Sequence, residues 1–218
     1  MFKTIIATAL LTTVAATGAS AHEIWLERHG DTVRTYVGDA TGERDRGETL
    51  VKLVPTSKLF ASDPAQVAPV SATPEHLVAK ATGVLGGKGD LRYYNDQVWA
   101  PWQNKEGVFE AAAFQARTGR SETRAVHDFE LVPLAPGSDS FTLLFKGQPL
   151  PATDVTLINP ALWGKTVKTD AAGRVTVPVS AKGRYILVAR HSAPADVEIA
   201  GQKVSKLQHI ASLSFDAK

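Results

Sequence analysis

Residues 165–179 read KTVKTDAAGRVTVPV, and this stretch decides the fold class. β-branched residues dominate on both sides of the central DAAG, as is typical of two short strands joined by a tight turn. Gly173 can adopt the positive φ that such a turn requires. The pattern therefore predicts a hairpin in which residues 165–169 pair with residues 174–179.

Similar short stretches recur along the chain, separated by turn residues at intervals of about 8–12 residues, which is the spacing of a β-sandwich. We expect strands at residues 23–28, 32–38, 49–54, 125–134, 141–145, 154–158 and 183–191, and a final ribbon of residues 196–199 and 203–215. A helical turn is expected at residues 74–80, and a helix at residues 107–117, where EAAAFQA is rich in helix formers. The prediction is an all-β, Ig-like or Greek-key sandwich of two packed β modules with at most short helices.

The N-terminus has the pattern of an export signal. Lys3 supplies a positive charge, residues 5–16 are apolar, and Ala-Ser-Ala at 19–21 is a cleavage site. We predict that residues 1–21 are removed after Ala21 and that no later segment spans a membrane. The pattern becomes more regular after residue 125, so we divide the mature chain into an N-terminal β domain, 22–130, and a C-terminal sandwich, 131–218.

Composition limits the partners and the ligands. The formal net charge is +2, which argues against nucleic acid or an anionic membrane surface as the main partner. The chain has no cysteine, and Met1 is its one methionine, so the mature protein has neither thiolate nor thioether ligands. A metal site must use histidine, carboxylate or the α-amine, and these donors favour Cu(II), Ni(II), Co(II) or Zn.

Cleavage after Ala21 makes His22 the first residue of the mature chain. An N-terminal histidine can chelate a metal through its α-amine and its ring Nδ1, and both groups can be deprotonated near neutral pH. The alternative is that cleavage happens to precede a histidine that points into water. His29 and His76 lie in polar turn segments and are expected to be solvated.

His127, His191 and His209 are each in phase with apolar neighbours on a predicted strand. If the final ribbon turns at residues 200–201, His191 lies close to His209 across the strands. A buried imidazole needs a hydrogen bond or a metal, so each of the three is either a hydrogen-bonded core residue or a ligand. We predict a metal site that combines His22 with ligands from this set of three, His127, His191 and His209; spacing alone does not decide which of them join His22.

The run GQPL at 147–150, with TDAAGRV at 169–175 and GRY at 183–185, resembles the carboxypeptidase-regulatory-like or Cna-B-like sandwich. HEIWLE at 22–27 directly after the signal, together with HDFELVP at 127–133, resembles an exported family that carries a domain of unknown function. Members are often labelled periplasmic components of cobalt or nickel uptake, and they commonly have Phe where this chain has Ile24. The resemblance implies a periplasmic, metal-handling role.

Three functions follow from these expectations. The first is a periplasmic protein that binds Ni, Co or Cu and assists an uptake system, with a membrane transporter or outer-membrane receptor as partner. The second is a copper histidine-brace oxidative enzyme, which needs an exposed binding face near the metal. Four aromatics could supply that face, although core packing is the preferred interpretation: Tyr93, Tyr94, Trp99 and Trp102. The third is a non-catalytic interaction module. No catalytic motif is present, and Glu23 and Asp128 are expected at the surface.

Overall fold

The computed structural model describes residues 22–218, and the predicted export signal lies outside the described residues. The helical segments are α1 (Glu48–Leu53), η1 (Val54–Thr56) and η2 (Gly83–Leu85). The strands are β1 (Glu23–His29), β2 (Thr32–Gly38), β3 (Lys58–Phe60), β4 (Ser71–Ala72), β5 (Leu77–Lys80), β6 (Leu91–Asn95), β7 (Trp102–Gln103), β8 (Phe109–Thr118), β9 (Phe129–Pro133), β10 (Ser140–Phe145), β11 (Gln148–Pro149), β12 (Asp154–Ile158), β13 (Gly164–Lys168), β14 (Arg174–Thr176), β15 (Gly183–Ile199) and β16 (Gln202–Ala217).

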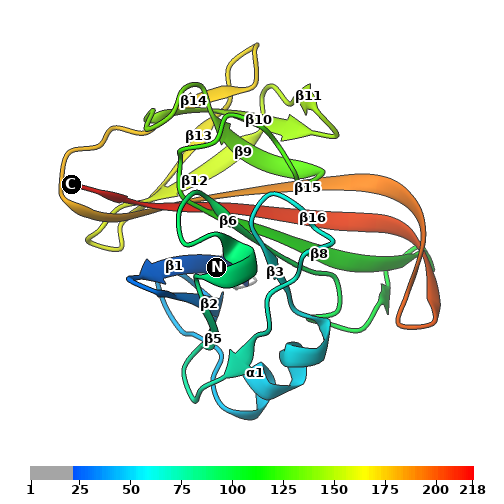
Figure 1. The fold of residues 1–218 in the computed structure, drawn as a ribbon. Helices are drawn as coiled ribbons and strands as arrows, with labels where there is room; N and C mark the ends of the chain where they lie inside the picture. The colour runs from blue at the N-terminus through cyan, green and yellow to red at the C-terminus, as the bar shows by residue number, and fades with distance from the viewer. Residues whose placement is uncertain (1–21) are drawn as a thin grey trace, which may run out of the picture.

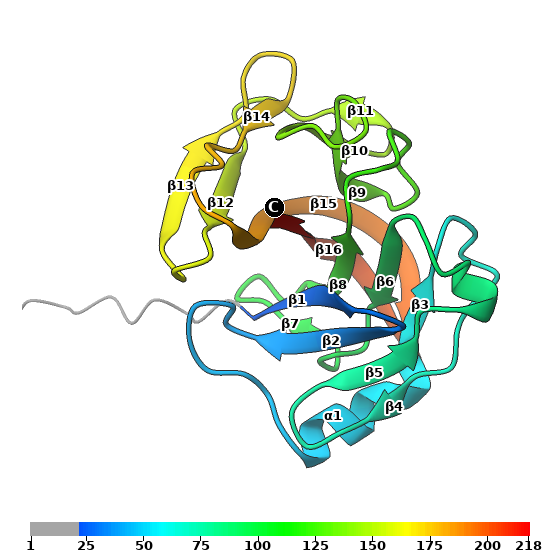
Figure 2. The same cartoon turned by 60° about the vertical axis from the view of Figure 1, so that its left-hand side comes forward.

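The strands form three packed sheets, and the all-β class predicted from the sequence is confirmed (Figure 1). The middle sheet has eight strands in the order β13-β12-β15-β16-β8-β6-β3, with β7 paired to β8. One outer sheet has the order β1-β2-β5-β4, and the other contains β9, β10, β11 and β14. Figure 2 shows β1, β2 and β5 on one side of β8 and β16, and β9 and β10 on the other side.

Alternation along β8 and β16 divides the apolar residues between the two faces of the middle sheet. Phe114 and Ile210 pack in the core beneath β1 and β2, which also contains Trp25. Ala211 and Leu213 pack in the core beneath β9 and β10. We call these the β1 face and the β9 face of the middle sheet.

The opening stretch of the sequence forms the predicted turn but not the predicted hairpin. Asp170 Oδ1 accepts the backbone N–H groups of Ala172 and Arg174 at 2.8 Å each, and Gly173 has a φ of 70°. However, β13 pairs with β12, and β14 pairs with β10 in the outer sheet. The turn could therefore be predicted from its own residues, whereas the strand that pairs with each side of it depends on distant segments.

Three other local predictions are wrong. Residues 107–117 are not a helix but most of β8, which is buried along nearly its whole length between β6 and β16. Tertiary pairing overrides the helix propensity of its alanines. Residues 49–54 fall largely in α1 rather than in a strand, and residues 74–80 contain β5 rather than a helical turn.

The two predicted modules share the middle sheet. The boundary predicted after residue 130 falls inside β9, and β8 of the first half pairs in parallel with β16 of the second half. Ile158, Ile186 and Ile210 of the second half pack in the core that lies beneath β1. Within residues 22–218, no helix has the length and apolar character needed to cross a membrane.

Candidate functional site

His191 and His209 are directly opposite each other on β15 and β16, as the turn position predicted. The chain turns at Ala200 and Gly201, both with positive φ, and a register shift between Pro194 and Val197 brings the two histidines into line. Phe145 lies against both rings, with centroid distances of 4.6 Å to His191 and 5.1 Å to His209. The pair is therefore held in an aromatic environment on the β9 face.

His127 and His209 line one cavity of about 350 Å³ on the β9 face, which we call the histidine cavity. Val126, His127 and Asp128, which directly precede β9, line one side of it. The middle sheet contributes Gln115 from β8, Tyr94 from β6 and Phe60 from β3. The cavity thus brings together two of the four predicted ligands.

Hydrogen bonds fix which ring nitrogen of each cavity histidine carries a hydrogen. The backbone N–H of Phe129 donates to Gln115 Oε1 at 2.9 Å, so the Gln115 amide donates through Nε2 to His209 Nδ1 at 3.0 Å. A neutral His209 therefore carries its hydrogen on Nε2. His127 Nε2 donates to the carbonyl of Ala116 at 3.3 Å, because a carbonyl can only accept. Its Nδ1 is the acceptor nitrogen.

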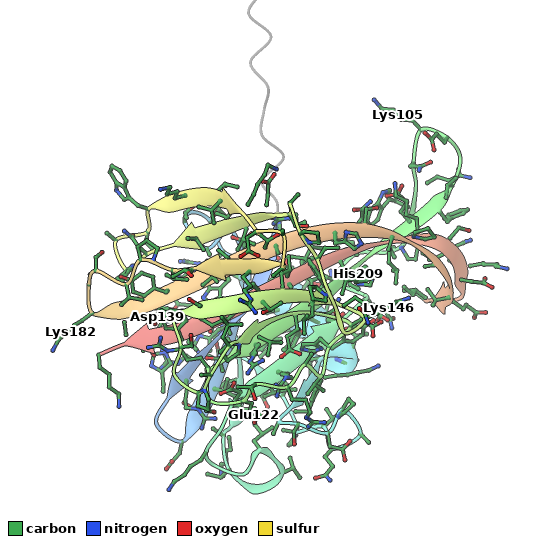
Figure 3. All side chains as sticks on the ribbon, turned by 90° about the horizontal axis from the view of Figure 1, so that it is seen from above. Lys105, Glu122, Asp139, Lys146, Lys182 and His209 are labelled. Carbon is green, nitrogen blue, oxygen red and sulfur yellow. The ribbon has the colours of Figure 1, made fainter. Side chains whose placement is uncertain are left out.

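Burial keeps both imidazoles neutral. Desolvation lowers the pKa of His127 to about 4, which nearby Glu130 only partly opposes. Desolvation likewise lowers the pKa of His209 to about 4, with Lys146 adding a smaller effect in the same direction. Figure 3 labels His209 and Lys146 in the same region of the molecule. The pKa of His191 is also lowered by burial.

His22 lies on the β1 face, separated from the other three candidates by the middle sheet. Its ring contacts Trp99 edge-on at 5.5 Å, and Trp99 contacts Phe114 on the β1 face at 5.3 Å. The next residue of β8, Gln115, points to the opposite face and reaches His209. The four candidate histidines are therefore divided between two faces.

Asp45 is a polar neighbour of the His22 ring. Its Oδ1 lies 3.2 Å from His22 Nε2. The backbone N–H of Asp45 donates to Val37 at 2.8 Å, which anchors this loop to β2. Gly38 has a φ of 126°, and a Cβ there would lie 2.6 Å from the carbonyl of Glu43, so the close approach of the loop requires glycine.

Glu23 was expected at the surface but is buried, with 6% exposure. It accepts the backbone N–H of Ala40 at 2.9 Å and pairs with Arg190 at 3.1 Å. Burial raises the pKa of the Glu23 carboxyl, and these two contacts only partly offset that effect. Asp128 is exposed, as expected.

A buried ion network lies beside the histidine cavity, and sequence reasoning missed it. Glu130 Oε1 accepts from Arg92 Nε and Arg117 Nη1 at 2.9 Å each, and both arginines are fully buried. Asp90 pairs with Arg117 on the other side. Burial alone would raise the pKa of Glu130, but the charges of Arg92 and Arg117 hold it below its usual value. Glu130 Oε2 also accepts the backbone N–H of His127 at 2.9 Å, which positions that histidine.

The four aromatics expected in the core are divided. Tyr93 is fully buried and its hydroxyl contacts Ser57 at 2.7 Å. Tyr94 lines the histidine cavity, and Trp102 is half-buried against the β1-face core. Trp99 is 40% exposed beside His22. The prediction that these aromatics pack in the core is therefore confirmed for Tyr93 and wrong for Trp99.

Within residues 22–218, no three side chains from His, Cys, Asp and Glu lie close enough together to hold a metal ion. No protein-family model matches the chain, and a search of curated proteins finds no relative.

Proposed function

We propose that this is an exported, periplasmic protein that binds a divalent transition metal, Ni(II), Co(II) or Cu(II), at the N-terminus created by cleavage after Ala21. The α-amine and Nδ1 of His22 are the two donors. The protein presents the metal to an uptake system, with a membrane transporter or outer-membrane receptor as its partner.

The observation that carries this proposal is the contact between Asp45 Oδ1 and His22 Nε2 at 3.2 Å. In metal sites the ring nitrogen that does not bind the metal commonly donates to a carboxylate, which fixes the ring and makes the other nitrogen a better donor. Asp45 engages Nε2, whereas a chelate ring with the α-nitrogen uses Nδ1. The contact with Asp45 therefore uses the ring nitrogen that the chelate does not need.

The surroundings favour an open site. Glu23 is the nearest carboxylate in sequence, but Arg190 and the Ala40 N–H already occupy it. The amine and one imidazole leave further coordination positions for water or for a donor from the partner. Structural metal sites are closed by protein ligands, so an open site suits capture and transfer better.

Calorimetric titration with Ni(II) and Cu(II) of a chain that begins at His22 tests the proposal. We expect one metal per chain. Keeping Ala21 in front of His22 converts the amine to an amide and removes the chelate, so the affinity falls by about 10²–10⁴-fold. Asp45→Asn weakens the support for the ring, and the affinity falls by about 10–100-fold.

His29→Gln is the matched control, because His29 lies at the far end of β1 and contacts Glu27. Its affinity should equal that of the parent chain. Equal affinity of the chains with and without Ala21 would remove the amine chelate from the proposal.

The separation of His22 from the other histidines also supports the second candidate, a non-catalytic interaction module. That function predicts no metal binding at His22, so the same titration distinguishes the two. A copper histidine brace needs a second imidazole beside the amine, whereas His127, His191 and His209 lie on the β9 face, across the middle sheet from His22.

A further inference from the structure

The histidine cavity has the size and lining of a small-molecule site. Its volume of about 350 Å³ lies at the lower end of the range of about 300–1,000 Å³ for ligand pockets. The walls include Phe60, Ala113 and Leu207, which are apolar. Lys58 and Asp128 are exposed at its rim and carry opposite charges.

Beside this cavity, His127 and His209 each have one ring nitrogen with no hydrogen-bond partner among residues 22–218. His127 is 8% exposed and His209 is 5% exposed, and each uses one ring nitrogen in a hydrogen bond to the protein. Among residues 22–218, the side-chain nitrogen or oxygen atom that is both fully buried and without a hydrogen-bond partner is His76 Nδ1. The second ring nitrogens of His127 and His209 do not belong to this class. The second nitrogens of His127 and His209 therefore reach accessible space, and the cavity is the space that both rings line.

These two nitrogens have opposite roles. His127 donates through Nε2 to Ala116, so its Nδ1 accepts. His209 accepts at Nδ1 from Gln115, so its Nε2–H donates. The cavity thus offers one acceptor and one donor, both uncharged, above apolar walls. Moving a charged group from water into this cavity would cost free energy, because neither ring carries an opposite charge that could replace the lost hydration.

We propose that the histidine cavity binds a small uncharged molecule that has a neighbouring donor and acceptor, such as a carboxamide, on an apolar body. The carboxamide N–H donates to His127 Nδ1, and its carbonyl accepts from His209 Nε2–H. The apolar body packs against Phe60 and Leu207. This site lies on the β9 face and is independent of the function proposed for His22 on the β1 face.

Nuclear magnetic resonance with benzamide as the probe, and benzoate and benzylammonium as charged probes of the same shape, tests this site. We expect benzamide to shift the side-chain ¹⁵N resonances of His127 Nδ1 and His209 Nε2, and to leave those of His29 unchanged. Benzamide should bind about tenfold more tightly than either charged probe, because the two neutral imidazoles offer no opposite charge to benzoate or to benzylammonium.

His127→Phe and His209→Phe should each weaken benzamide binding by about 3–10-fold, and His29→Gln should leave it unchanged. The ¹⁵N shifts of the unmodified protein give the answer even if a variant fails to fold. Absence of a shift at both cavity histidines, or tighter binding of benzoate or benzylammonium, would overturn the proposal.

Discussion

Glu130→Ala lowers the free energy of unfolding by about 3–5 kcal/mol, the largest loss from one substitution that we expect in this protein. Glu130 lies between the guanidinium groups of Arg92 and Arg117, which are both fully buried. Its removal leaves two buried cations short of a counter-charge. It also removes the acceptor of the backbone N–H groups of Val126 and His127.

Urea unfolding at pH 7 measures this loss. Glu130→Gln keeps the shape and some acceptor capacity, so it should lose about 1.5–3 kcal/mol and provides a variant that remains folded. The control is Asp154→Asn, because Asp154 pairs with Lys168 at 2.7 Å on the surface. That control should change the stability by less than about 1 kcal/mol. A Glu130→Ala loss as small as that of the control would show that the network is not stabilising.

Mild acid is the second condition with a large expected effect. The pKa values of His127 and His209 are about 4 in the folded protein, against about 6.5 for an unperturbed histidine. The unfolded chain therefore binds more protons than the folded chain between these values, and stability falls as the pH falls through that window. From pH 7 to pH 5 each histidine should cost roughly 2 kcal/mol. His191 acts in the same direction.

Urea unfolding at pH 7 and pH 5, compared between variants, isolates this effect. His127→Gln and His209→Gln should each reduce the difference between the two pH values by roughly 2 kcal/mol. The exposed-site variant His29→Gln should retain the full difference. Carboxylates with lowered pKa values, such as Asp90 and Glu130, lose their contribution mainly below this window. An unchanged difference in both cavity variants would mean that the two rings are not buried as neutral groups.

The local features of this protein were predictable from sequence where they rest on turn chemistry and strand alternation. The turn at residues 200–201 placed His191 beside His209, and the structure confirms that pairing. The alternation around His127 also indicated a buried ring, which the structure confirms at 8% exposure. Both predictions depend on neighbours in sequence or on one hairpin.

Features that depend on distant pairing were not predictable. The alanine-rich segment 107–117 forms a strand because β16 and β6 pair with it on either side. Its own residues do not indicate which strands those partners are. The packing of β1 against the face of the middle sheet opposite β9 also places His22 and His209 on opposite faces. Nothing in the polar segment around Asp45 indicated that it contacts His22, since the two residues are 23 positions apart.

Electron paramagnetic resonance of Cu(II) bound to the chain that begins at His22 tests the metal site most directly. We predict one imidazole nitrogen and one amine nitrogen in the coordination sphere, and loss of this spectrum when Ala21 is retained. A spectrum with two or more imidazole nitrogens, or the same spectrum with Ala21 retained, would contradict a site built on the N-terminal amine of His22.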